Sequence, residues 1–188
     1  MNEEYRGTGF QFRKGGYKWH VNPDWALRGA DAENEYKPAM REGTWETLNV
    51  YFMTRYKAST DAPGGRCPNP TNMANDDINL PLDGCTIHFA TVPGGGAKHV
   101  NGRMDLGKTA VHEVGHWLGL WHTFESHGGA AGGCEPGDFV DDTPAQKEQS
   151  TSCVQRDTCK DSPGLDPYRN YMDYSPDDCM SEFTPGQR

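Results

Sequence analysis

The chain has 188 residues, of which 34% are hydrophobic and 24% charged, and its formal net charge is -9. That length suits one domain with a sizeable core, or two very small ones. The mean hydropathy is -0.86, and no apolar run approaches the roughly 20 residues of a membrane helix, which excludes a membrane-spanning protein. The acidic charge without a basic patch excludes a general binder of nucleic acid or anionic membranes.

The six cysteines, none of them in a CxxC pair, favour three disulfides and an oxidising compartment over buried reduced thiols. The opening MNEEYRGTGF lacks the apolar core of a signal peptide. The closing FTPGQR has the pattern of a helix start, with Thr184 as N-cap, Pro185 at the first helical position and Gln187 at the capping-box position. We therefore expect a secreted protein in a form trimmed at both ends.

In chain order, the first predicted elements are strands. The alternation of Phe10 and Phe12, followed by paired glycines, predicts a hairpin over Gly9–Val21. Thr47–Tyr56 has apolar residues on both of its faces and is predicted as a strand covered on both sides. Residues 59–85, rich in Pro, Gly, Asn and Asp, are predicted as a long loop closed by a bridge between its two cysteines.

Cys85–Val92 is the next predicted strand, and three consecutive glycines follow it. The stretch DLGKTAVHEVGHWLGL is the most strongly periodic helix of the chain. Residues 125–188 carry four cysteines and little periodicity, which predicts an irregular, disulfide-stapled region. The sequence thus favours an α+β protein, with sheet and helix first and irregular chain last.

The segment HEVGHWLGLWH indicates a metal site. His112 and His116 are four residues apart, so one helix face can present both to one ion. Glu113 lies about 100° round the helix from His112, where it can reach a water on that ion. A continuous helix would point His122 away, but Gly119 can accept positive φ, end the helix and turn the chain back.

Three neutral imidazoles with one open position are typical of catalytic zinc, because structural zinc is usually closed by four protein ligands. Zinc lowers the pKa of a bound water towards about 7, and a neighbouring carboxylate can take its proton. The alternative is a buried helix whose histidines are only hydrogen-bonded. The motif predicts zinc bound by His112, His116 and His122, with Glu113 as general base.

HEVGHWLGLWH is similar to the extended zinc motif of the metzincins, which also require a later methionine-containing turn. Together with GDFVDDTP (Gly137–Pro144) and NYMDYSPDDCMSEFTPGQ (Asn170–Gln187), it resembles the pappalysin or cytophagalysin family, peptidase family M43, and in particular its secreted fungal members. The resemblance is strong from about Thr86 onward. Before that, MNEEYRGTGFQF resembles the first helix of the family running into its second strand.

The resemblance implies a single metzincin-like catalytic domain over residues 1–188. Its upper subdomain, residues 1–122, would hold a mixed twisted sheet and the active-site helix. Its lower subdomain, residues 123–188, would be irregular and stapled by disulfides. Met172 would form the apolar floor under the metal, although the residue alone suggests an ordinary core methionine. Tyr174 would stabilise the oxyanion, the alternative being a packed surface tyrosine.

The resemblance also implies the disulfides Cys134–Cys159 and Cys153–Cys179, with Cys67–Cys85 as the third pair. A four-cysteine zinc site is the rival, but the spacings lack the short pairs such sites prefer. Calcium is implied in GDFVDDTP, where Asp138 and Thr143 match and Asp141 or Asp142 could add carboxylates. The acidic family position two residues after the threonine is Ala145 here, and the alternative is that these aspartates cap turns.

As a whole, the sequence predicts a secreted, monomeric zinc endopeptidase. Its peptide substrate would lie extended along an edge strand, for which we expect Thr86–Thr91. Asp173 or Asp177 could favour a basic side chain after the cleaved bond. The rivals are a zinc hydrolase with a narrow non-proteolytic substrate and a catalytically silent, zinc-stapled protein-binding module; the intact Glu113 argues against the second.

Overall fold

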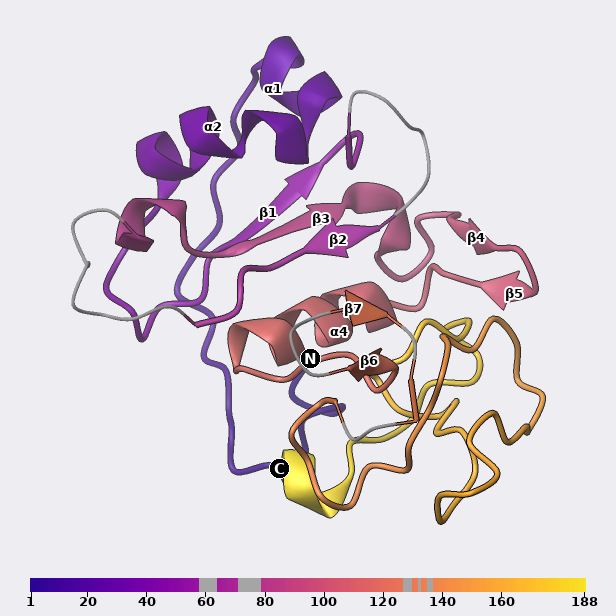
Figure 1. The fold of residues 1–188 in the computed structure, drawn as a ribbon. Helices are drawn as coiled ribbons and strands as arrows, with labels where there is room; N and C mark the ends of the chain where they lie inside the picture. Colours follow the sequence, from indigo (N-terminus) through magenta and orange to yellow (C-terminus); the bar gives the residue numbers. More distant parts are fainter. Residues whose placement is uncertain (58–63, 71–78, 127–129, 132, 135–136) are drawn as a thin grey trace.

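The computed structural model describes residues 1–57, 64–70, 79–126, 130–131, 133–134 and 137–188 (Figure 1). Its α-helices are α1 (Pro23–Arg28), α2 (Glu33–Met40) and α4 (Lys108–Trp117). Its strands are β1 (Val50–Met53), β2 (Gly65–Arg66), β3 (Cys85–His88), β4 (Lys98–His99), β5 (Gly102–Arg103), β6 (Glu125–Ser126) and β7 (Ala130–Ala131). Short 3-10 turns cover Ala30–Ala32, Leu80–Leu82, Phe89–Thr91 and Pro185–Gln187.

The main sheet has the strand order β1-β3-β2, with β1 parallel and β2 antiparallel to β3. This mixed sheet, with α1 and α2 on one side and α4 on the other (Figure 1), confirms the α+β expectation. All four residues of β3 are buried. The expectation that Thr86–Thr91 forms an edge is wrong, because β3 is the central strand and the chain turns into a 3-10 helix from Phe89 onward. The edge beside α4 is β2, which the sequence did not predict.

The predicted strand over Thr47–Tyr56 is shorter in the structure and is covered on only part of its surface. Tyr51 and Met53 of β1 are buried against Tyr36 of α2. On the other face Val50 packs on the core around α4, but Phe52 remains 54% exposed. Residues 58–63 and 71–78 of the predicted long loop lie outside the described residues.

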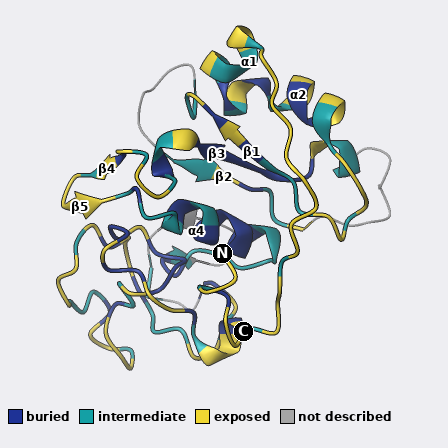
Figure 2. Cartoon of the chain, turned by 180° about the vertical axis from the view of Figure 1, so that it is seen from behind, coloured by how far each residue is buried: buried dark blue, intermediate teal, exposed yellow. Residues whose placement is uncertain are grey.

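The hairpin predicted over Gly9–Val21 does not form (Figure 2). The backbone N–H and C=O of Phe12 bond the side-chain amide of Asn2 rather than a neighbouring strand. Phe12 packs against the core, but Phe10, Trp19 and Val21 are 49%, 89% and 97% exposed, so the segment as a whole does not bury one apolar face. The helix expected over the opening residues is also absent, since residues 2–7 form turns and residues 8–9 a bend.

Helices α1 and α2 were not predicted, although α1 carries a recognisable start signal. The Asn22 side chain accepts a hydrogen bond from the Trp25 N–H, and Pro23 occupies the first helical position. At the other end of the chain the predicted helix start is present as a 3-10 turn. Thr184 and Gln187 form the capping box there.

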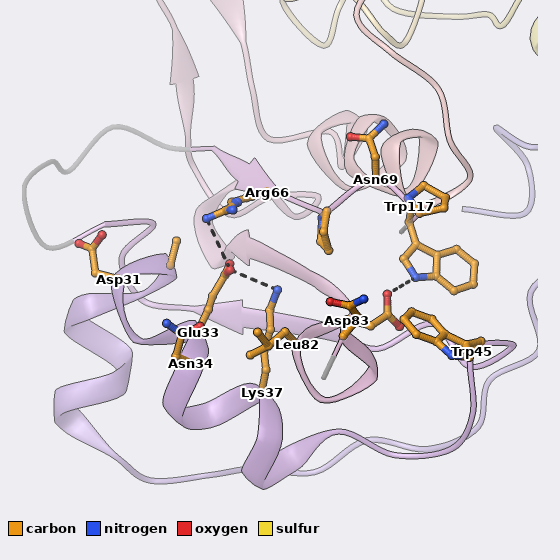
Figure 3. Close-up of a pocket in the computed structure, with 14 residues that line it drawn as sticks. Asp31, Glu33, Asn34, Lys37, Trp45, Arg66, Asn69, Leu82, Asp83 and Trp117 are labelled. Carbon is orange, nitrogen blue, oxygen red and sulfur yellow. Dashed lines mark hydrogen bonds and ion pairs between the residues drawn. The ribbon is translucent and has the colours of Figure 1, made fainter. Parts of the chain in front are cut away.

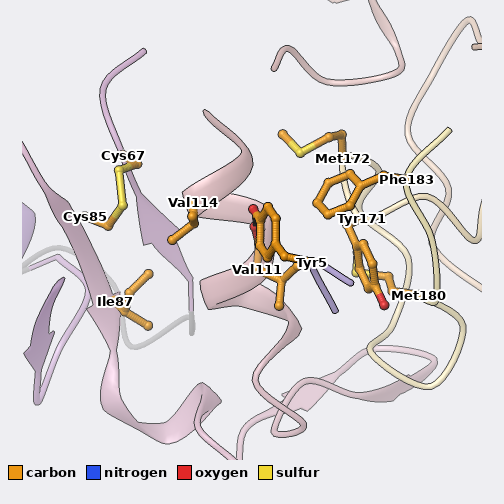
Figure 4. Packing of buried hydrophobic residues seen from close by; sticks show 10 residues of the cluster. All are labelled: Tyr5, Cys67, Cys85, Ile87, Val111, Val114, Tyr171, Met172, Met180 and Phe183. Carbon is orange, nitrogen blue, oxygen red and sulfur yellow. Dashed lines mark hydrogen bonds between the residues drawn. A yellow bond between two sulfur atoms is a disulfide. The ribbon is translucent and has the colours of Figure 1, made fainter. Parts of the chain in front are cut away.

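The larger core cluster lies around α4 (Figure 4). Val111 and Val114 of the helix pack toward Ile87 of β3 on one side and toward Tyr171 and Met172 on the other. The helix is therefore held between the sheet above and the irregular chain that follows His122 below (Figure 1). Three disulfides are formed, joining the pairs that the resemblance implied: Cys67–Cys85, Cys134–Cys159 and Cys153–Cys179.

Over the described part of the chain, every helix falls short of the length and apolarity that a bilayer-spanning segment needs.

Candidate active site

Helix α4 ends where the sequence predicts a change of direction. The last helical residue is Trp117, and Gly119 takes a φ of 99°, a conformation that L side chains rarely adopt. The N–H of Gly119 donates to the His116 carbonyl at 2.8 Å, and the N–H of Leu120 donates to the Gly115 carbonyl at 3.0 Å. The helix is thus closed off and the chain turns back toward its own side chains.

This turn brings the three histidines of the motif together. The Nε2 atoms of His112 and His116 are 3.1 Å apart, those of His116 and His122 are 3.0 Å apart, and those of His112 and His122 are 3.1 Å apart. They are the only group of three or more His, Cys, Asp or Glu residues with converging ligand atoms among the described residues.

Each histidine is oriented through its other ring nitrogen. Nδ1 of His112 lies 2.7 Å from the Tyr171 carbonyl, and Nδ1 of His116 lies 2.8 Å from the Leu120 carbonyl. Nδ1 of His122 lies 2.7 Å from a carboxylate oxygen of Glu125. Because carbonyls and carboxylates only accept, each Nδ1 carries the proton and each neutral ring directs a bare Nε2 lone pair inward.

Three lone pairs facing one another need a cation between them. Burial lowers the pKa of all three histidines, that of His122 to about 3, so the rings are neutral as metal ligation requires. A tetrahedral zinc ion with Zn–N bonds of about 2.0–2.1 Å separates its nitrogen ligands by roughly 3.3 Å, close to the distances here. The donor set therefore fits zinc.

Glu113 lies on the same helix, next to the first histidine, and is 6% exposed. Burial raises the pKa of its carboxyl to about 8, and the backbone amide of Cys67, which donates to it, acts in the opposite direction. A Cβ added at Gly65 would lie 2.6 Å from the Glu113 Cγ, so only glycine allows β2 to approach this side chain so closely. The carboxyl is thus held between the helix and the edge strand.

Met172 packs against α4, and Tyr174 lies beside the histidine rings. Met172 is fully buried, and a Cβ added at Gly115 of α4 would lie 2.4 Å from its sulfur atom. Tyr174 is 41% exposed, with ring centroids 5.5 Å from His112 and 4.8 Å from His122. Burial raises the pKa of the Tyr174 hydroxyl to about 12, so it remains a hydrogen-bond donor at neutral pH.

A cavity of about 410 Å³ opens beside these groups, lined by Gly64 and Gly65 of the edge region, by His112, Glu113 and Tyr174, and by Asp173 and Asp177. Both oxygens of Asp173 are occupied, by Gln146 Nε2 and by the N–H groups of Ser150 and Tyr174.

The carboxylate of Asp177 is engaged through one oxygen. Its Oδ2 accepts from the N–H groups of Leu106 and Lys108 at 2.8 and 3.4 Å, and its Oδ1 accepts nothing from the described residues. Of the two aspartates considered for specificity, only Asp177 therefore offers a vacant acceptor beside the cavity.

A larger cavity, about 510 Å³, lies away from the histidines (Figure 3). Its charged groups already have partners: Glu33 pairs with Lys37 and Arg66 at 3.3 and 3.7 Å, and Asp83 accepts from Trp117 Nε1 at 2.8 Å. Among the described residues, no group of three His, Cys, Asp or Glu side chains converges on this space, so the histidine group is the stronger candidate site.

The residues considered for calcium are only partly brought together. Asp138 is 5% exposed, and its Oδ1 accepts from the Val140 N–H. No hydrogen bond of normal geometry reaches its buried Oδ2 or the buried Thr143 hydroxyl, although the two side chains lie close enough for the hydroxyl to lower the pKa of the carboxyl. Burial raises the pKa of Asp138. Asp141 and Asp142 are exposed, and an oxygen of Asp142 accepts from the Gly186 N–H.

Sequence reasoning missed three parts of this site. Glu125, which orients His122, carried a weak signal as an acid three residues after a ligand. Gly65 and the Cys67 amide, which meet Glu113 from β2, carried none, because the contact joins residues that are almost 50 positions apart in the chain. The edge strand itself has two residues, too few to produce a pattern.

A family model for Peptidase M43, described as pregnancy-associated plasma protein-A, matches residues 37–188. An extracellular metalloprotease of Pyricularia oryzae is 48% identical over 192 residues, which cover 100% of this chain and 61% of the relative. An extracellular metalloprotease of Neurospora crassa is 43% identical over 189 residues, with the same shares covered. The chain thus spans about three fifths of the length of these relatives.

Among solved structures, mirolysin in complex with compound 9 matches with a TM-score of 0.61 and 33% identity, covering 78% of this chain and 51% of that chain. Mature mirolysin of Tannerella forsythia in complex with a cleaved peptide matches with a TM-score of 0.59 and 34% identity, covering 77% and 50%. The family model covers most of the chain and includes the whole histidine site. The chain therefore belongs to the Peptidase M43 family, as the resemblance of its motifs implied.

Proposed function

We propose that this protein is a secreted zinc endopeptidase that hydrolyses peptide bonds in proteins. The observation that carries the proposal is the convergence of three neutral, individually oriented imidazoles next to a buried carboxyl at an open cavity. Relatives named as extracellular metalloproteases support both the activity and the location. His112, His116 and His122 would hold the ion.

Zinc, when bound, lowers the pKa of a water towards about 7 and polarises the scissile carbonyl. A cation held by the three histidines would favour the ionised form of the nearby Glu113, which has a raised pKa without it. In that form Glu113 accepts the proton of the attacking water and delivers it to the leaving amine. The protonated hydroxyl of Tyr174 donates a hydrogen bond to the negative charge that develops on the carbonyl oxygen. Met172 supplies an apolar support beneath the histidines.

The substrate would lie along β2. Within the described residues, β2 pairs only with β3, through Gly65 with Ile87 and Arg66 with Thr86, so its outer edge has unpaired main-chain groups. An extended peptide can add to such an edge as a further strand. The proximity of Gly65 to Glu113 brings the scissile bond of that peptide to the catalytic carboxyl.

Cleavage of casein tests the proposal, with the zinc-loaded protein measured alongside a chelator-treated sample and Glu113→Ala. We expect the wild type to cleave, the chelator to abolish cleavage, and the variant to bind zinc normally but lose turnover. Near-normal turnover by the variant would exclude Glu113 as the base. A peptide library tests for the narrow hydrolase, and an absence of any cleavage would favour the zinc-stapled binding module.

We infer that the cavity prefers a basic side chain after the cleaved bond, because Asp177 offers a vacant carboxylate oxygen there. Asp177→Asn should lower the ratio of kcat/KM for a peptide with arginine at that position to kcat/KM for one with leucine. The ratio corrects for any general loss of folding, since both peptides report on the same folded enzyme. An unchanged ratio would exclude Asp177 as a specificity determinant.

We also propose a calcium ion at Asp138, supported by the buried Oδ2 and the buried Thr143 hydroxyl, which lie close together without a hydrogen bond of normal geometry. An unsatisfied buried carboxylate oxygen is costly, and calcium prefers oxygen ligands in loose geometry. Millimolar calcium should raise the Tm of the wild type and not that of Asp138→Asn. Equal shifts in both proteins, or none in either, would argue that Asp138 only caps the turn at Val140.

A further inference from the structure

The Cys67–Cys85 disulfide lies between the sheet and the active-site helix rather than at the periphery (Figure 4). Cys85 is the first residue of the central strand β3, and Cys67 directly follows the edge strand β2. The two cysteines are 0% and 6% exposed, and they pack in one cluster with Ile87 and Val114. The bond thus joins the strand that borders the substrate cavity to the strand at the centre of the sheet.

Both halves of this disulfide also touch Glu113. The backbone amide of Cys67 donates to the Glu113 carboxylate, and the sulfur atom of Cys85 lies 3.7 Å from the Glu113 carbonyl oxygen. Gly65, two residues before Cys67, packs against the Cγ of the same side chain. The position of the carboxyl therefore depends on where the segment 64–67 lies.

Among the described residues, few other interactions hold that segment, and the ion pair of the exposed Arg66 with Glu33 at 3.7 Å is one of them. Strand β2 pairs with β3 over two residues, and the His88 N–H donates to the Gly64 carbonyl at 2.9 Å. Further along, Asn69 Nδ2 donates to the Leu120 carbonyl at 3.3 Å. A two-residue strand at a sheet edge is marginal without a tether, whereas the disulfide fixes it covalently.

We propose that the Cys67–Cys85 disulfide is a positioning element for catalysis, which holds β2 and the Cys67 amide against Glu113. Without it, β2 moves away from β3 and the carboxyl loses the amide that orients it, although the three histidines and the fold remain. This inference rests on the proposed peptidase function. Small displacements of a catalytic group lower turnover by up to about 100-fold.

The test compares Cys67→Ala/Cys85→Ala with Cys134→Ala/Cys159→Ala. The two bonds close loops of similar length, with sequence separations of 18 and 25, so their removal has a similar effect on the unfolded chain. Assays are run below the melting transition of both variants, with zinc content measured. We expect kcat of the first variant to fall about 10- to 100-fold and kcat of the second to stay within about twofold of the wild type. Equal values of kcat in the two variants would overturn the proposal.

A third variant, Cys67→Ala/Cys85→Val, restores buried volume without restoring the tether. If the bond served only packing, this variant would recover kcat together with stability; the proposal requires that it recover stability alone. It also replaces the alanine pair if that pair does not fold.

Amide hydrogen exchange supplies a readout that needs no activity. The backbone amides at positions 67 and 88 should exchange at least about tenfold faster in the Cys67→Ala/Cys85→Ala variant than in the wild type, while those of Val111–His116 remain protected. If the wild type cleaves nothing, the proposed function fails, but the exchange rates still test the tether. Unchanged protection at Cys67 and His88 would overturn it.

Discussion

At the scale of single residues, Glu125 is the only side chain of the described residues that accepts a hydrogen bond from Nδ1 of one of the three histidines; the other two donate to main-chain carbonyls. Groups that orient metal ligands typically change metal affinity by 10- to 100-fold when removed. Glu125→Leu should therefore weaken zinc binding about 10- to 100-fold, and Glu125→Gln, which keeps an acceptor, should weaken it less. Competition with a chromogenic chelator measures this, with Glu46→Gln as an exposed control. Equal affinities in all of these proteins would contradict the assignment.

Alanine substitutions at the neighbouring glycines Gly65 and Gly64 test how the position of the Glu113 carboxyl affects catalysis. A Cβ at Gly65 would lie 2.6 Å from the Glu113 Cγ, whereas a Cβ at Gly64 would meet only the Tyr56 ring at 3.4 Å. Gly65→Ala should displace Glu113 and lower kcat about 10- to 100-fold with zinc retained, and Gly64→Ala should show a much smaller loss. Steady-state kinetics with metal analysis distinguish the two. Similar losses in both variants would imply that this edge tolerates no side chain at all.

At the scale of elements, the end of α4 depends on a single glycine. Alanine at the φ of 99° found for Gly119 is strained by about 1–2 kcal/mol, and relaxing that strain moves His122. Gly119→Ala should lower both the free energy of unfolding in urea and the affinity for zinc. Gly96→Ala is the control, because Gly96 has a φ of 88° with open space around it. It should lose stability alone; loss of zinc affinity there as well would assign the effect to general destabilisation.

The sequence predicts those elements whose signals are local. His112, His116 and Gly119 lie within eight residues of one another, and Thr184 with Gln187 within four, so spacing alone defines the helix, its end and the capping box. The hairpin over Gly9–Val21 fails because alternation predicts a strand only where a neighbour exists, and the Asn2 side chain takes the backbone groups of Phe12. The position of β3 at the centre of the sheet depends on β2, which is too short to recognise.

At the scale of the whole molecule, acid should destabilise the metal-free protein. The three histidines have folded-state pKa values below the 6.5 of an unfolded chain, so stability is lost as the pH falls below about 6.5, by up to about 1.4 kcal/mol per pH unit for each histidine. Glu113 acts in the opposite direction: its folded pKa of about 8 lies above its unfolded value, so stability is also lost as the pH rises toward 8.

The free energy of unfolding of the metal-free protein, measured by urea denaturation from pH 5 to pH 9, should therefore be largest near pH 6.5. In Glu113→Gln, the free energy of unfolding should no longer fall as the pH rises above this maximum, but it should still fall as the pH drops below it. A curve that is flat between pH 5 and pH 6.5 would mean that the histidines are not buried as neutral rings.

The way the histidines are oriented has a consequence for mutational tolerance. Two of the three orienting acceptors are carbonyl oxygens, of Tyr171 and Leu120, and every amino acid supplies that atom. Random substitution at these two positions cannot delete the acceptor and can act only by shifting the backbone. Among variants that fold, a saturation library should therefore tolerate many residues at position 120 and few at 125, while position 171 is limited by the place of Tyr171 in the core rather than by its acceptor. Mutation can therefore reach the orientation of the histidine group chiefly through His122.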